Sequence, residues 1–156
     1  MAITSAICNS FKQEILVGTH NFTNSSGNTF KIALYSSDSA TLSKSTTAYT
    51  APADGTADPT NTYEVTSTSS GYTTGGNSLT NTTPVLSGDT ACCKFSDTSW
   101  GSSASFTARG CLIYNSSASN KAVCAINFGS DKTVTSGTFT IQFPAQTAGN
   151  AIIQIA

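Results

Sequence analysis

The clearest pattern in this chain is a series of short apolar runs separated by polar turns. Four β-type runs occupy the C-terminal third, at residues 105–115, 121–128, 138–143 and 151–155. Segments rich in Ser, Asn and Gly separate them, as is typical of turns. Because each run is followed by a turn and then by another run, the pattern predicts an antiparallel meander.

The N-terminal segment has a different period. Ile3, Ile7, Phe11 and Ile15 recur every four residues, which is the spacing of one face of a helix. We therefore predict a helix over residues 4–17. Its apolar face has two interpretations: it covers one end of the β-core, or it docks onto a neighbouring subunit.

Three further runs lie between these two regions. Residues 30–35 alternate apolar and polar side chains and predict a strand with one buried face. Residues 79–86 and 92–95 predict two more strands joined by a tight turn. Trp100 follows them, at a predicted corner where a tryptophan either closes one end of a sandwich or stacks on a ligand.

Residues 36–78 lose this periodicity, because Ser, Thr, Asp, Gly and Pro dominate and only a short run near residues 63–66 looks extended. Long loops of this kind are either mobile or engaged with partners. We expect an exposed contact surface, with a partly disordered tip as the alternative. Tyr49, Tyr63 and Tyr72 lie in it, and together with the apolar face of the predicted helix they are the candidate interface residues.

These segments predict an all-β fold: an antiparallel β-sandwich of about seven or eight strands with one short N-terminal helix. Sequential strands with polar turns need a second sheet to bury their apolar faces. At 156 residues the chain has the length of one domain with its own core. We assign residues 1–156 to a single domain, with the helix in residues 1–18.

The low content of charged residues indicates a mostly uncharged surface. Charged residues make up 10% of the chain and the net charge is −1, whereas an ordinary soluble domain is about 25% charged. The basic residues are scattered, which argues against binding nucleic acid. No apolar segment is long enough to span a membrane, and no export signal is recognisable at the N-terminus. A surface with so little net charge is compatible with assembly.

Five cysteines are present, at positions 8, 92, 93, 111 and 124. The odd count, the adjacent pair and the lack of an export signal favour reduced thiols packed as small hydrophobic side chains. Cys111 and Cys124 fall on neighbouring predicted strands, so a disulfide between them is the alternative. A zinc site is disfavoured, because His20 is the only histidine and no Cys-x-x-Cys spacing occurs.

No catalytic arrangement is recognisable. His20 lies in a polar turn beside no carboxylate or cysteine in sequence, and the acidic residues mostly occupy turns, where they cap backbone amides. Asp54 and Asp58 could contribute to a calcium site, but no ladder of ligands accompanies them. We therefore predict neither an enzyme nor a cofactor.

Several segments resemble those of small structural proteins of tailed bacteriophages. They are the opening Met1–Ala6, Phe11–Leu16, Phe30–Tyr35, Gly71-Tyr72 with Gly75-Gly76, Leu79–Pro84, Ser105–Gly110, Leu112–Asn115, Phe128–Lys132 and Phe139–Pro144. The resemblance implies a virion component of the capsid decoration (cement) type. Such a protein would be made in the host cytoplasm and would bind the major capsid protein at capsomer junctions, as a homotrimer on the capsid surface.

A second interpretation keeps the protein in the virion but places it in the tail, as a tail, baseplate or fibre adaptor with host-recognition loops. Tyr49, Tyr63, Tyr72 and Trp100 would then form a platform for a sugar. Copy number per particle separates the two interpretations, because a decoration protein is present in hundreds of copies.

Overall fold

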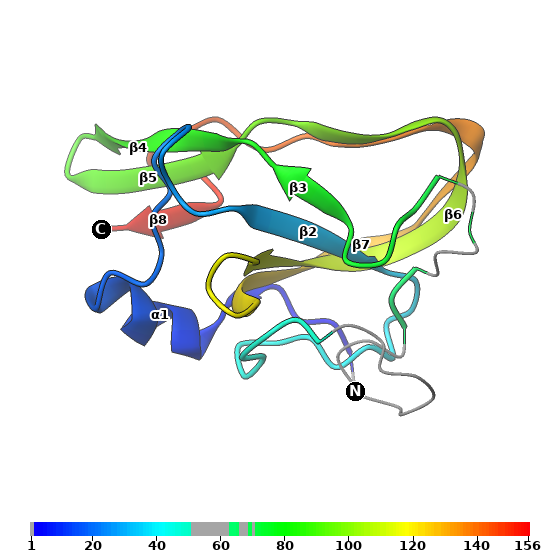
Figure 1. Ribbon diagram of the computed structural model, residues 1–156, viewed down its shortest axis with the longest axis horizontal. Coiled ribbons are helices and arrows are strands. Elements are labelled where there is room, and N and C mark those ends of the chain that lie inside the picture. The colour runs from blue at the N-terminus through cyan, green and yellow to red at the C-terminus, as the bar shows by residue number, and fades with distance from the viewer. Residues whose placement is uncertain (1, 51–62, 66–68, 70) are drawn as a thin grey trace.

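The computed structural model describes residues 2–50, 63–65, 69 and 71–156 and consists of two antiparallel sheets and one helix (Figure 1). The elements are β1 (Ala6–Ile7), α1 (Asn9–Leu16), β2 (Phe30–Tyr35), β3 (Asn77–Leu79), β4 (Asn81–Ser87), β5 (Thr90–Phe95), β6 (Thr98–Asn115), β7 (Lys121–Ile141) and β8 (Ile153–Ile155). The 5-stranded sheet has the order β1-β7-β6-β2-β3 and the 3-stranded sheet the order β4-β5-β8. The predicted all-β, sandwich-like fold with a short N-terminal helix is confirmed.

The β6–β7 ribbon dominates the fold. β6 has 18 residues and β7 has 21, and the ribbon bends back at one end of the molecule, so that its two halves lie in different layers (Figure 1). Register shifts between Trp100 and Phe106 accompany the bend. The prediction of separate strands at 121–128 and 138–143 is therefore wrong: bulges, rather than turns, absorb the glycines and serines between them.

Trp100 lies inside β6, not at a corner between strands. Its side chain is 2% exposed and packs edge-on against Phe106 and Phe139, with Tyr72 stacked 6.2 Å away between ring centroids. It therefore closes the packing between the layers, as the first of the two interpretations predicted.

The N-terminal segment differs from its prediction. The helix begins at Asn9, and residues 6–7 form β1, which pairs with β7. Backbone hydrogen bonds hold the extended stretch, from the Thr4 N–H to the Leu42 carbonyl at 2.8 Å and from the Cys8 N–H to the Val123 carbonyl at 3.0 Å. Positions four apart share a face in a strand as well as in a helix, so the apolar spacing could not separate the two.

The described parts of residues 36–78 differ from the predicted exposed excursion, because several of their side chains are buried. Ala40 and Leu42 are 0% exposed, and Tyr49, Val65 and Tyr72 are also buried. The Val65 N–H donates to the Leu34 carbonyl at 2.8 Å, which ties the segment to β2. Residues 51–62, with the calcium candidates Asp54 and Asp58, lie outside the described residues.

Candidate functional site

Most of the candidate interface residues belong to the core. Ile3, Phe11, Tyr49 and Tyr72 are 2–5% exposed, and Ile7 and Ile15 are partly buried against the same cluster. Tyr63, at 36%, is exposed. Within one subunit the six other residues pack in or against the core, and the helix face covers the β-core. Their part in an interface stays a prediction.

Glu64 explains why the tyrosines are buried. Its carboxylate accepts hydrogen bonds from the Tyr49 hydroxyl at 2.9 Å, the Tyr72 hydroxyl at 2.8 Å and the Gly75 N–H at 2.6 Å. The Tyr72 hydroxyl also accepts the Leu34 N–H at 3.0 Å. These contacts connect three stretches of residues 36–78 to one another and to β2.

Burial and hydrogen bonding have opposite effects on the ionisation of Glu64. Burial raises the pKa of Glu64, and the hydrogen bonds from Gly75, Tyr72 and Tyr49 oppose this rise. Burial together with the Glu64 charge raises the pKa of both tyrosines. A carboxylate that is 5% exposed and has three donors is a structural anchor, because buried polar groups persist where they are satisfied.

His20 pairs with a carboxylate, although no carboxylate lies beside it in the sequence. The chain turns back after α1, and His20 Nε2 lies 2.8 Å from Glu14 Oε2, while Lys121 Nζ lies 2.6 Å from Glu14 Oε1. Burial acts to raise the pKa of Glu14, but the hydrogen bonds and charges of Lys121 and His20 outweigh it and lower the pKa.

The second ring nitrogen of His20 is also occupied. Asn115 Nδ2 lies 3.0 Å from His20 Nδ1, and Ser117 donates to Asn115 Oδ1 at 2.9 Å, which fixes the orientation of the amide. His20 Nδ1 is then an acceptor and Nε2 carries the proton that is donated to Glu14. With both nitrogens engaged and the side chain buried, His20 is not placed to act as a general base.

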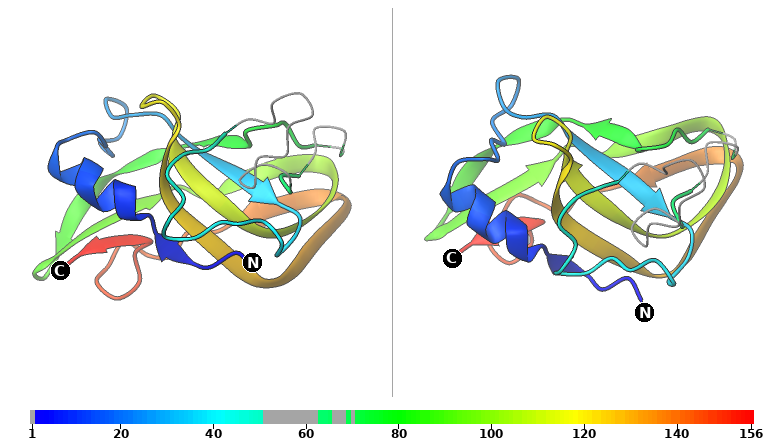
Figure 2. Two further views of the ribbon diagram at one scale, coloured as in Figure 1. Left: turned by 90° about the horizontal axis from the view of Figure 1, so that it is seen from below. Right: turned by 60° about the horizontal axis from the view of Figure 1, so that its bottom comes forward.

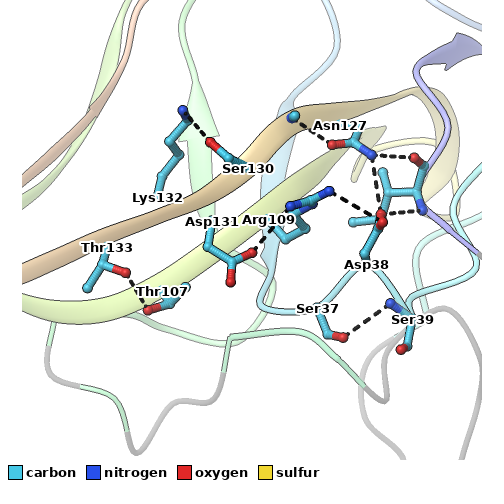
Figure 3. A network of polar contacts seen from close by, with 12 residues as sticks. Ser37, Asp38, Ser39, Thr107, Arg109, Asn127, Ser130, Asp131, Lys132 and Thr133 are labelled. Carbon is cyan, nitrogen blue, oxygen red and sulfur yellow. Dashed lines mark hydrogen bonds and ion pairs between the residues drawn. The ribbon is translucent and has the colours of Figure 1, made fainter.

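A second polar network fastens the N-terminus to the β6–β7 ribbon (Figure 3). Asp38 accepts the Ile3 N–H and the Asn127 side-chain amide, both at 3.2 Å, and Arg109 lies between Asp38 at 3.4 Å and Asp131 at 3.7 Å. These hydrogen bonds and ion pairs join the N-terminal segment to the β6–β7 ribbon and hold it in place. The charged groups in this network are bonded to one another, so they do not form a binding site for a charged ligand.

The cysteines behave as the composition suggests. All five are free and buried, and burial raises the pKa of Cys8 to about 11 and that of Cys93 to about 12. Thiols with raised pKa values are poor nucleophiles, which confirms their packing as small hydrophobic side chains. Within the described ranges, no three His, Cys, Asp or Glu side chains are grouped so as to hold a metal ion.

The surface stands out at one end of the molecule, where large apolar side chains are exposed. Leu16 (86%), Val17 (74%), Leu86 (75%) and Ile155 (55%) are among the most exposed apolar residues. The end of α1, the β4–β5 hairpin and β8 meet there, at the left of Figure 1. A soluble monomer rarely exposes contiguous apolar surface without a use for it.

The pairing of the small sheet shows that these side chains belong together. Leu86 is paired with Ala91, and Ala91 with Ile155, so the three form one row on one face of the sheet. By alternation this is the face of Cys93 and Phe95, which are both buried in the core. The row therefore continues the core face beyond the point where other elements cover it.

A groove of about 390 Å³ joins this row to α1. It is lined mainly by Phe11, Ile15 and Leu16 on one side and by Ile153 and Ile155 on the other. Figure 2 shows α1 and β8 beside each other at this end. We call Leu16, Val17, Leu86 and Ile155, with this groove, the apolar end.

Sequence reasoning missed the apolar end. Leu16 falls within the helix predicted over residues 4–17, and residues 79–86 were predicted only as a strand. The available signal was the run Ile15-Leu16-Val17 immediately before Gly18, since three consecutive residues span about 200° of a helix, which is wider than one buried stripe.

Comparison with protein-family models, with curated proteins and with solved structures found no match to this chain. In the described part of the chain, no helix combines the length and the hydropathy that crossing a bilayer requires.

Proposed function

We propose that this protein is a virion structural protein: a capsid decoration protein that binds the major capsid protein at capsomer junctions and stabilises the head. The observation that carries the proposal is the apolar end, where large apolar side chains from the end of α1, from β4 and from β8 are exposed together. The resemblance to small phage structural proteins supplies the identity of the partner.

The physical case rests on stiffness and adhesion. Packed DNA loads a phage shell from inside, and a protein that binds only the assembled shell stabilises it by mass action. The long β6–β7 ribbon and the anchors at Glu64 and Asp38 make the subunit a rigid support for the apolar end. As a homotrimer it would present this surface three times, and simultaneous engagement strengthens weak contacts.

The alternative role, in a tail, baseplate or fibre, has less support. Its sugar platform required exposed aromatic rings, and Tyr49, Tyr72 and Trp100 are each at most 5% exposed. Tyr63 alone of that set reaches the surface. An enzymatic role has no support in the described residues, since His20 and Glu64 are both buried and held by structural hydrogen bonds.

The test is binding to particles that lack the protein. The double variant Leu16→Glu with Leu86→Glu places two charges in the apolar end, and we expect its occupancy on such particles to fall by at least about tenfold. The control Ser102→Glu with Thr135→Glu adds the same charge in the bend of the β6–β7 ribbon and should bind normally. Equal binding of both variants would reject the apolar end as the interface.

Copy number tests the location independently. A quantitative gel of purified virions should show hundreds of copies per particle for a decoration protein, and a few dozen or fewer would place the protein in the tail. Particles without it should assemble but release DNA at a lower temperature.

A further inference from the structure

A second and larger groove opens on the flank of β7, between the two layers of the fold. It measures about 710 Å³ and is lined by Cys111, Ile126 and Phe128 from the larger sheet and by Phe143 and Ile152 from the segment between β7 and β8. Cys111 is 0% exposed and Phe143 is 8% exposed. The groove therefore reaches residues of the core and is more than a shallow depression of the surface.

The polar groups of this groove lie at its mouth. Among the described residues that line it, Lys132, Thr140 and Gln142 are polar, and Lys132 alone of these carries a charge. All three are exposed, whereas the apolar lining residues are mostly buried or partly buried. A cavity of roughly 300–1,000 Å³ with apolar walls and a few polar groups is typical of sites for small molecules.

The charge of Lys132 is not neutralised by an acidic side chain of the described residues. Its ammonium group donates to the Ser130 hydroxyl at 2.9 Å, and it belongs to none of the ion pairs in this part of the chain. The neighbouring carboxylate of Asp131 lies on the other side of β7 (Figure 3) and pairs with Arg109 at 3.7 Å. The mouth of the groove therefore favours an anion over a cation.

We propose that this groove binds a free aliphatic carboxylate of medium chain length, with the carboxylate at Lys132 and the alkyl chain between the two layers. An ammonium group and a carboxylate form a charge-assisted hydrogen bond, and each methylene that leaves water strengthens binding about fourfold. A second copy of this chain fits less well, because its apolar side chains are held on a folded surface, whereas a flexible alkyl chain can enter between layers. The inference does not depend on the virion role, since other residues form the apolar end.

The first test is isothermal titration calorimetry of the whole chain with dodecanoate below its micelle concentration. We expect saturable binding, at least about tenfold tighter than that of dodecyltrimethylammonium, which has the same alkyl chain and the opposite charge. Octanoate, with a shorter chain, should bind at least about tenfold more weakly than dodecanoate. Absence of saturable binding, or equal binding of the cationic amphiphile, would overturn the proposal.

Lys132→Met tests the role of the charge, because it keeps an unbranched apolar side chain and removes the ammonium group. We expect dodecanoate to bind at least about fivefold more weakly, with no weakening of dodecyltrimethylammonium. The matched control is Lys44→Met, at an exposed lysine outside the groove, and it should change binding less than about twofold. Equal losses in the two variants would reject Lys132 as the site of the carboxylate.

Phe128→Ala tests the apolar wall. Phe128 is partly buried against the core, and its loss should weaken dodecanoate binding at least about fivefold. If circular dichroism shows that this variant does not fold, Ile152→Ala, on the opposite wall and also partly buried, replaces it with the same expectation. Unchanged affinity in a folded wall variant would overturn the proposal.

The location is tested separately, because alkyl chains also adsorb to exposed apolar surface. A dodecanoate analogue with a diazirine in its chain, irradiated in the complex, should label residues of the groove, which peptide mass spectrometry identifies. Leu16→Glu with Leu86→Glu should bind dodecanoate within about twofold of the natural chain. Labelling of α1 or β8, or loss of binding in this double variant, would place the ligand at the apolar end and overturn the proposal.

Discussion

The Glu64 site and the apolar end invert the usual distribution of polarity. Glu64, a carboxylate, is 5% exposed, whereas Leu86 is 75% exposed. The buried carboxylate is surrounded by donors from three segments, while the leucine continues a core face that nothing described here covers. The difference shows that chemical character alone does not indicate a functional site: the buried carboxylate is bonded within the fold, and the apolar side chain is exposed to solvent.

The largest change in the free energy of unfolding is expected for a substitution in helix α1, on the buried side of this comparison. Phe11 is 2% exposed and packs against the rings of His20 and Phe22. Phe11→Asp should therefore lower the free energy of unfolding by about 4 kcal/mol, through the lost apolar contacts and a buried charge without a partner. Urea denaturation followed by circular dichroism measures it. A variant that folds normally but fails to bind particles would instead make Phe11 an interface residue.

Glu64→Leu tests the polar half of the comparison directly. The change leaves the Tyr49 and Tyr72 hydroxyls and the Gly75 N–H without their acceptor, and we expect a loss of about 3 kcal/mol. Glu64→Gln, which keeps an acceptor oxygen, should lose less. If Glu64→Leu were as stable as the natural chain, the carboxylate would not be an anchor, and a binding role for it would have to be reconsidered.

The carboxyl groups of Glu64 and Glu14 should also give pH dependences of opposite sign. The pKa of Glu64 is raised above 4.5, so from about that pH upward the folded chain keeps a proton that the unfolded chain has released, and stability falls as pH rises through the raised pKa. The pKa of Glu14 is lowered from 4.5. Its contribution is present above the unfolded value and is lost as pH falls through the lowered value.

Two variants separate these contributions. Glu64→Gln should remove the fall in stability above about pH 4.5 and keep the loss of stability at low pH that comes from Glu14. Glu14→Gln should remove the loss at low pH and keep the fall above about pH 4.5. The urea midpoint at a series of pH values measures both. If the urea midpoint changed with pH equally in the two variants and in the natural chain, neither carboxyl group would change its pKa on folding.

The sequence predicted the fold class because alternation along each strand is local. It located residues 30–35 with the bounds of β2, and it placed β8 within residues 151–155. It did not locate the Glu64 site, because Tyr49, Glu64, Tyr72 and Gly75 have no common period and meet only through tertiary contacts. The start of α1 was misplaced for a related reason, since pairing of Ala6 and Ile7 with β7 depends on residues more than a hundred positions away.

The candidate site was predicted less well than the fold. Apolar residues were assigned either to the core or to an interface by their spacing, and spacing does not say where the covering elements stop. Leu86, Ala91 and Ile155 carry the same kind of side chain as the buried positions of their strands. Only the arrangement of the layers shows that their row extends past the larger sheet, so this information is absent from any single segment.

The smallest effect on stability is expected at the apolar end itself. Leu16 and Leu86 are 86% and 75% exposed, so Leu16→Glu with Leu86→Glu removes little buried area and should change the free energy of unfolding by less than about 0.5 kcal/mol. Denaturation of the isolated subunit measures this beside the particle-binding assay. A large loss of stability would mean that these leucines pack within the subunit, and the contrast with Glu64 would then disappear. An unchanged fold with lost binding would locate the adhesive surface where apolar side chains contribute to assembly and not to folding.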